Sequence, residues 1–167
     1  LIENLVEETA GWLVLAMVWD DDAQEAFRLV LPLDSITSWD DVLVDVPEGL
    51  KDGIPFAWSR YIDQRFALVP GVVKDADENP VAMRLWFENK TASRYLTQPF
   101  HTSQDPRIER SGNGIAIQVS LVPNAPFIQW VLHHGAAAQV LEPASLREMM
   151  GSETRKMAQG YAKMFGP

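Results

Sequence analysis

Five basic residues in the second half of the sequence have the spacing expected of a site for an anion. They are Arg84, Lys90, Arg94, Arg107 and Arg110. The pattern predicts Arg84 on a strand, with Lys90 and Arg94 one turn apart on the following helix. Guanidinium and ammonium groups bind phosphate and carboxylate oxygens, so this group is a candidate site for a nucleotide, an oligonucleotide or a small anionic effector. An ordinary solvated surface is the alternative.

Four further residues are candidate ligand contacts. His101 and Gln104 lie in one predicted loop, and they either contact a ligand or dock that loop. Trp12 is a candidate platform on which a base can stack. Arg28 is a basic residue in the same half of the chain. With Arg84 and Arg94 these residues complete the predicted ligand site.

Catalysis needs a nucleophile or a metal together with a tuned acid or base, and the sequence supplies few of these groups. It contains no cysteine. His133 and His134 are adjacent, so on a helix their side chains diverge by about 100° and cannot form the i, i+4 pair of a metal site. We therefore predict no enzyme activity, no metal and no cofactor.

The acidic runs and the glycines also lack a chemical signature. The run at 20–22 with Glu25 lacks the alternation and the glycine of a calcium loop, so a solvated turn is the better interpretation. The acidic residues between 40 and 45 are interpreted in the same way, as surface charge. Gly112 and Gly114 form neither a phosphate loop nor a dinucleotide fingerprint, and we expect them in a turn.

The composition indicates a packed protein outside the membrane. Of 167 residues, 47% are hydrophobic, which is enough for a core. No apolar run reaches the roughly 18 residues of a membrane helix, and no signal peptide is evident. The absence of cysteine fits a reducing compartment, so we expect a cytoplasmic protein. The sequence opens at Leu1 rather than Met, and we expect a fragment or a processed form.

Charge divides the sequence into two parts. Residues 1–80 hold 17 Asp and Glu against 5 Lys and Arg, whereas residues 81–167 hold 6 against 9. The net charges of −12 and +3 predict two units with different surfaces. A chain with a net charge of −9 is a poor general binder of duplex DNA, because that affinity depends on neutralising phosphates.

Hydrophobic periodicity predicts a small antiparallel sheet in the first part. Strands are expected at 2–8, 12–19 and 26–31, with short turns between them. The spacing at 55–66 is helical, and Pro55 suits the first turn of that helix. The polar stretch that follows is a candidate boundary. We therefore divide the chain at 1–54, 55–79 and 80–167.

The second part has a more regular pattern. Strands are predicted at 81–87, 103–110, 115–122 and 138–141, with helices at 90–97, 125–134 and from Pro143 to about Met164. Asn89 and Asn124 are expected to cap the first two helices, and Gly135 to end the second. The order β-α-β-β-α-β with a terminal helix is the ferredoxin-like arrangement. The predicted fold class is α+β.

Three segments of this second part resemble the WCX domain that follows the WYL domain in many bacterial transcription regulators. They are FHTSQ at 100–104, FIQWVL at 127–132 running to Gly135, and VLEP at 140–143 with Leu146 and Arg147. The segments occur in the family's order with similar gaps. The helix at 55–66 resembles the linker helix that precedes the domain, so the resemblance covers about Pro55 to Phe165.

The first part resembles the C-terminal part of a WYL domain, a small Sm/SH3-like barrel. The segment GWLV at 11–14 stands in place of the Trp-Tyr-Leu signature, and LPLDSI at 31–36 in place of Phe-Arg-Leu-Asp-Arg-Ile. The signature Tyr is Leu13, and the two arginines fall on Pro32 and Ser35. Arg28 is close in sequence but in another register. These departures affect the positions at which the family's effector site is expected.

The resemblance implies the effector-sensing and dimerisation region of a bacterial DNA-binding regulator. It implies a homodimer that reaches operator DNA through a helix-turn-helix domain outside this chain. The substitutions at Pro32 and Ser35 favour a second hypothesis, a dimerisation module without a ligand. An enzyme on a ferredoxin-like scaffold is a third hypothesis, because fold alone does not decide activity.

Overall fold

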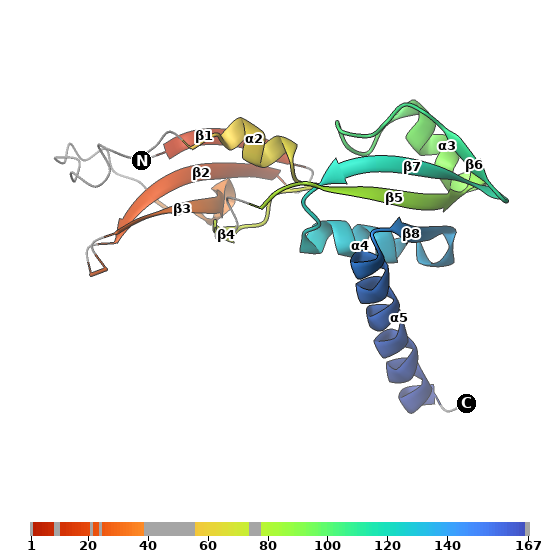
Figure 1. The fold of residues 1–167 in the computed structure, drawn as a ribbon. Helices are drawn as coiled ribbons and strands as arrows, with labels where there is room; N and C mark the ends of the chain where they lie inside the picture. The colour runs from red at the N-terminus through yellow and green to blue at the C-terminus, as the bar shows by residue number, and fades with distance from the viewer. Residues whose placement is uncertain are drawn as a thin grey trace. The chain divides into compact units, whose positions relative to one another are not determined.

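The computed structural model describes residues 2–8, 11–20, 22–23, 25–38, 56–73 and 78–165 (Figure 1). The chain folds into two compact units. The first comprises Leu1–Asp63 with Ala67–Glu78, and the second comprises Gln64–Phe66 with Asn79–Pro167. The division at 1–54, 55–79 and 80–167 that the sequence suggests stays a prediction. None of the described helices is long and apolar enough to cross a membrane.

The first unit is built on an antiparallel sheet. Its strands are β1 (Ile2–Glu8), β2 (Gly11–Asp20), β3 (Glu25–Pro32) and β4 (Gly71–Val72), in the order β1-β2-β3-β4. The three predicted strands are confirmed, and the two-residue β4 was not predicted. Among the described residues the outer strands β1 and β4 do not pair, so closure into a barrel stays a prediction.

One face of this sheet forms the core of the first unit. Leu13, Leu15 and Val30 lie on it with Trp58 and Leu68. Trp58 opens the short helix α2 (Trp58–Asp63), which is half the length of the predicted helix at 55–66. A single 3-10 turn, η1 (Leu33–Ser35), follows β3.

The early end of α2 has a backbone cause. The carbonyl of Gln64 accepts a hydrogen bond from the amide of Val122 at 2.7 Å, and Arg65 forms a parallel bridge with Val122. Gln64 therefore lies in a turn and Arg65 in a bridge, and the helical ladder ends before them. Pro55, the predicted first residue of the helix, lies outside the described part of the chain.

The second unit has the predicted ferredoxin-like topology. Its strands β5 (Val81–Glu88), β6 (Glu109–Ser111), β7 (Gly114–Leu121) and β8 (Ala138–Glu142) are antiparallel in the order β6-β7-β5-β8. Helices α3 (Asn89–Thr97) and α4 (Ala125–His133) connect them, with the 3-10 turn η2 (Gly135–Ala137) before β8. The long helix α5 (Ala144–Phe165) ends the unit.

Alternation along β5 separates the two faces of this sheet. Met83, Leu85 and Phe87 enter the core together with residues of α3 and α4. Arg84 and Trp86 alternate with them and therefore project from the opposite face, which we call the open face. The hydrophobic core thus lies entirely on the helix side, and the open face is free to carry polar groups.

Local signals in this unit were confirmed at three positions and wrong at two. Asn124 caps α4, accepting from the amide of Phe127, while Gly112 and Gly135 have φ values of 60° and 56°. Asn89, however, lies inside α3, whose N-cap is Glu88. The strand predicted at 103–110 is also reduced to β6, because Asp105 turns back on Arg107 instead of extending.

Candidate functional site

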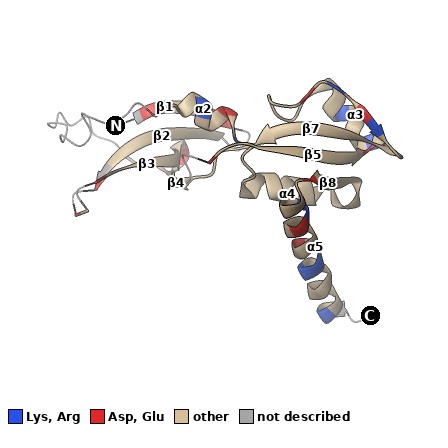
Figure 2. Ribbon diagram, viewed as in Figure 1, with Lys and Arg blue, Asp and Glu red and all other residues tan. Residues whose placement is uncertain are grey.

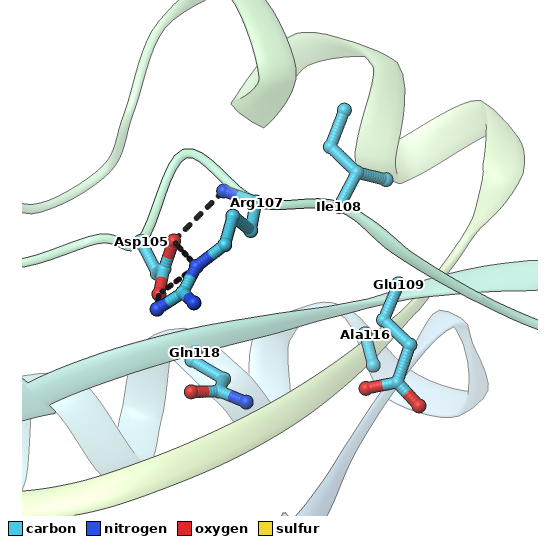
Figure 3. A pocket seen from close by; sticks show the side chains of 6 residues that line it. All are labelled: Asp105, Arg107, Ile108, Glu109, Ala116 and Gln118. Carbon is cyan, nitrogen blue, oxygen red and sulfur yellow. Dashed lines mark hydrogen bonds and ion pairs between the residues drawn. The ribbon is translucent and has the colours of Figure 1, made fainter.

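A polar hollow on the open face of the second unit is the candidate site (Figure 3). We call it the sheet hollow. Its volume is about 290 Å³, and it is lined by Asp105, Arg107, Ile108, Glu109, Ala116 and Gln118. Ala116 and Gln118 lie on β7, while the other residues come from β6 and the loop that leads into it.

An ion pair within one tight turn forms one side of the sheet hollow. Arg107 Nη2 lies 2.7 Å from Asp105 Oδ2, and the Arg107 amide donates to Asp105 Oδ1 at 2.8 Å. These bonds lower the pKa of Asp105 and raise that of Arg107. The amide of Asp105 donates to the carbonyl of Gln118 at 2.9 Å, which anchors the turn to β7.

A second cation adjoins the hollow. Arg84 forms ion pairs with Glu109 on one side and, at 3.7 Å, with Glu142 on the other. The register places Arg84 opposite Gln118 on the neighbouring strand. The site therefore holds two guanidinium groups, and each already has a carboxylate partner. An anion can enter only by competing with those carboxylates.

The five basic residues that the sequence grouped lie on two sides of the sheet. Arg84 and Arg107 are at the open face. Lys90 and Arg94 are exposed on α3, whose Ala92 and Tyr95 pack into the core on the opposite side. Arg110 pairs with the core residue Ile115, and so its side chain also faces the helix side. The five residues do not form one site.

His101 is held by hydrogen bonds within the protein. Its Nε2 lies 3.2 Å from the carbonyl of Arg65, which can only accept, so Nε2 carries the proton. Its Nδ1 accepts from the amide of Ser103 at 3.1 Å, and the Ser103 hydroxyl donates to the carbonyl of Ser120. This geometry fits the docking role that the sequence left open. A ligand role for His101 stays a prediction.

Gln104 has a similar setting. Its Nε2 donates to the carbonyl of Tyr95 at 2.8 Å, and its Oε1 accepts from the amide of Phe100 at 3.3 Å. The first bond satisfies a carbonyl in the last turn of α3, which has no partner within the helix. Gln104 thus fixes the loop after α3, and its proposed contact with a ligand also stays a prediction.

Trp12 and Arg28 lie on opposite faces of the sheet in the first unit. Arg28 pairs with Met17, which shares a face with Leu13, whereas Trp12 projects to the other face. Trp12 is 45% exposed, as a stacking platform requires. The structure does not bring the two side chains together, so a single small ligand cannot contact both.

Arg28 lies in an aromatic cluster. Its Cζ is 4.5 Å from the ring centre of Phe56, and its Nε is 3.6 Å from Glu3 Oε2. The same carboxylate oxygen accepts from Trp58 Nε1 at 2.9 Å. Cation–π and ionic contacts therefore fix the Arg28 side chain against the core of the unit.

No metal site appears among the residues that the structure describes. Asp20 Oδ1 accepts from the amides of Asp22 and Ala23, which makes this segment a turn, as predicted. Asp21 and the acidic residues between 40 and 45 lie outside the described residues. The rings of His133 and His134 are 6.1 Å apart at 70°, and His134 Nε2 contacts the hydroxyl of Tyr95 at 2.9 Å instead.

Asp105 and Gln118 were missed as site residues. The available signal for Asp105 was its position two residues before Arg107 with Pro106 between them, a spacing that favours a turn. Gln118 is a polar residue at an exposed position of an alternating strand. Its proximity to Asp105 depends on the pairing of distant segments, which local sequence does not encode.

The sheet hollow falls within a recognised domain. Residues 79–158 match the family model of the WCX domain. The match runs from just before β5 into α5 and includes every residue of the hollow. No curated protein matches the chain. The predicted WYL part and the role in a regulator stay predictions.

Proposed function

We propose, from the WCX domain at residues 79–158, that this chain is the effector-sensing and dimerising region of a bacterial DNA-binding transcription regulator. WCX domains are found in WYL-type regulators rather than in enzymes. Operator DNA is contacted by a domain outside this chain. The effector binds the chain and changes the relation between two protomers, which repositions their DNA-binding domains.

The sheet hollow is the proposed effector site. The observation that carries this proposal is the ion pair between Arg107 and Asp105. The Arg107 side chain is 89% exposed although it makes this pair, so a ligand can reach it. A phosphate or carboxylate of a ligand can replace Asp105 on the guanidinium with little net change in hydrogen bonding. The released Asp105 then accepts from a donor group of the same ligand.

The size and charge of the hollow narrow the ligand class. A volume of about 290 Å³ accommodates one charged group and its neighbours rather than a whole large molecule. A nucleotide or the end of an oligonucleotide supplies both a phosphate for Arg107 and hydroxyl or amino donors for Asp105. This ligand class is the one that the geometry supports best.

The effector site is tested by ligand-induced thermal shift on the 167-residue chain. ATP, GTP and short single-stranded DNA are the probes, and Arg107→Gln is the site variant. Loss of one charge-assisted contact is expected to weaken binding about tenfold. Arg60→Gln on α2 makes the same change at an exposed position in the first unit, outside the hollow and outside α5, and it should bind as the wild type does. Equal binding by both variants would place the site elsewhere.

A dimerisation module without a ligand is the second candidate. It is favoured by Pro32 and Ser35, which stand where the WYL pattern has arginines, and by the two carboxylates that already engage Arg84. Arg84→Ala and Arg107→Ala in the full-length regulator distinguish the two candidates, because both side chains lie at the sheet hollow. Regulation that survives both substitutions supports the module without a ligand.

A further inference from the structure

Helix α5 extends well beyond the domain that it completes. It has 22 residues and runs away from the sheet of the second unit (Figure 1). Leu146 and Met150, in its first half, are buried in the core. Farther along, Met157, Tyr161 and Met164 are 51%, 63% and 79% exposed. The second half of the helix therefore presents large apolar side chains to solvent.

These residues follow a regular pattern. Met150, Met157, Tyr161 and Met164 with Thr154 between them are separated by alternating steps of four and three residues. That spacing is the seam of a two-helix coiled coil, in which each helix covers the apolar stripe of the other. We call these five residues the α5 stripe. Met150 already packs into the core of the unit, whereas the part of the stripe from Thr154 to Met164 is left exposed for a second helix to cover.

A groove lies along the α5 stripe. Its volume is about 570 Å³, and one wall consists of Met150, Thr154, Met157 and Tyr161. The other wall comes from α4, η2 and β8, with small side chains such as Ala136 and Ala138. Gly151 and Ala158 flank the stripe, so that a second helix can approach the α5 backbone closely.

We propose that the occupant of this groove is α5 of a second copy of the chain, packed antiparallel. The proposal rests on the dimerisation proposed above and names its surface. In a two-fold symmetric dimer each α5 forms a wall of its own protomer's groove and also occupies the groove of the other protomer. An isologous interface has this reciprocal arrangement. The chain itself supplies a helix that is apolar along one stripe and reaches beyond its own domain.

The charges of α5 select the antiparallel direction (Figure 2). Its first half carries Glu148 and Glu153 with Arg147, whereas its second half carries Arg155, Lys156 and Lys163 and no acid. A parallel pair would bring the two basic halves together. An antiparallel pair centred near Met157 brings Lys163 of each helix towards Glu153 of its partner, which is favourable even for exposed charges.

Sedimentation equilibrium on the complete chain tests the surface. Tyr161→Glu places a charge in the stripe at an exposed position and is expected to raise the dimer Kd at least about tenfold. Gln159→Glu adds the same charge at an exposed position that does not line the groove, and its Kd should match the wild type. Circular dichroism checks that both variants stay folded.

The outcomes separate the surface from dimerisation itself. If the wild type dimerises and Tyr161→Glu has the same dimer Kd, the proposal that α5 forms the interface is overturned, while the proposed dimer stands. A wild type that stays monomeric overturns both.

Disulfide trapping tests the direction, because the chain has no cysteine of its own. Met157→Cys lies near the middle of an antiparallel overlap and should form an intermolecular disulfide on oxidation. Met164→Cys lies near the tip of each helix. The two tips are at opposite ends of an antiparallel pair, so this variant should not form the disulfide. Cross-linking of both variants would indicate a parallel pair and contradict the proposal.

Discussion

Gly114 illustrates how tightly the open face is packed at the scale of one residue. A Cβ on this residue would lie 2.3 Å from the carbonyl oxygen of Phe87 and 2.4 Å from the indole of Trp86. The indole is itself held by its Nε1, which donates to the carbonyl of Ser111 at 2.9 Å. Neither obstacle can move easily, so only glycine fits here.

Gly114→Ala is therefore expected to lower the free energy of unfolding by about 1–3 kcal/mol, because the methyl group overpacks a rigid site. Chemical denaturation followed by tryptophan fluorescence measures the loss. Gly160→Ala, at a helical position with open space around it, should have no such cost and should slightly favour the helix. A Gly114→Ala protein as stable as the wild type would show that the hairpin relaxes.

His134 makes the stability of the second unit depend on pH. Burial, followed by the charges of His133 and Arg94, lowers its pKa from the ordinary value of 6.5. Burial also raises the pKa of Tyr95, whose hydroxyl lies at a hydrogen-bond distance of 2.9 Å from His134 Nε2. The folded state thus favours neutral His134. Its contribution is complete above pH 6.5 and is lost as the pH falls towards the lowered pKa.

Urea midpoints at pH 7.5 and pH 5.5 check this dependence. The wild type should be less stable at pH 5.5, and His134→Phe should reduce the difference between the two midpoints because it removes the titrating group. If the pH dependence of the variant equals that of the wild type, another group is responsible.

At the scale of elements, the two asparagines beside α3 and α4 form a natural pair for comparison. Asn124 Oδ1 accepts from the amide of Phe127 at 3.2 Å, which satisfies a free donor in the first turn of α4. Asn89 lies within α3 and makes no side-chain cap. Asn124→Ala should cost about 1 kcal/mol, whereas Asn89→Ala should be neutral or mildly stabilising.

Thermal denaturation of the two variants measures this difference directly. A loss of stability in Asn124→Ala that Asn124→Ser restores would assign the effect to the cap. Equal effects of the two alanine substitutions would contradict it.

Regular elements were predictable because their signals are local. The alternation in β7 and the cap and glycine around α4 each act within a few residues. The strand expected at 103–110 was wrong for a reason that is also local. Pro106 has no amide to donate to a ladder, and Asp105 binds Arg107 across it. The pattern of apolar residues alone therefore predicted a continuous strand where the chain turns.

The candidate site was less predictable, since its contacts join distant segments. Arg84 contacts Glu109, which is 25 residues away, and His101 contacts Arg65, 36 residues away. The type of each residue was visible in the sequence, but its face of the sheet was not. Arg84 and Arg94 were grouped for this reason, although they project from opposite sides of the same unit.

At the scale of the whole molecule, the contrast in charge follows the division of the chain. The acidic first part and the weakly basic second part correspond broadly to two separately packed units. The sheet hollow and the α5 groove both belong to the second unit. A ligand bound in the sheet hollow can influence dimerisation through the groove along α5 only if its affinity differs between monomer and dimer.

The most direct test of effector sensing measures the coupling between ligand binding and dimerisation. The dimer Kd of the 167-residue chain is determined by sedimentation equilibrium with and without the nucleotide or oligonucleotide that gives the largest thermal shift. A sensing module should change its Kd by about fivefold or more at saturation, and Arg107→Gln should abolish the change. A ligand that binds while the dimer Kd stays the same would contradict effector sensing through dimerisation.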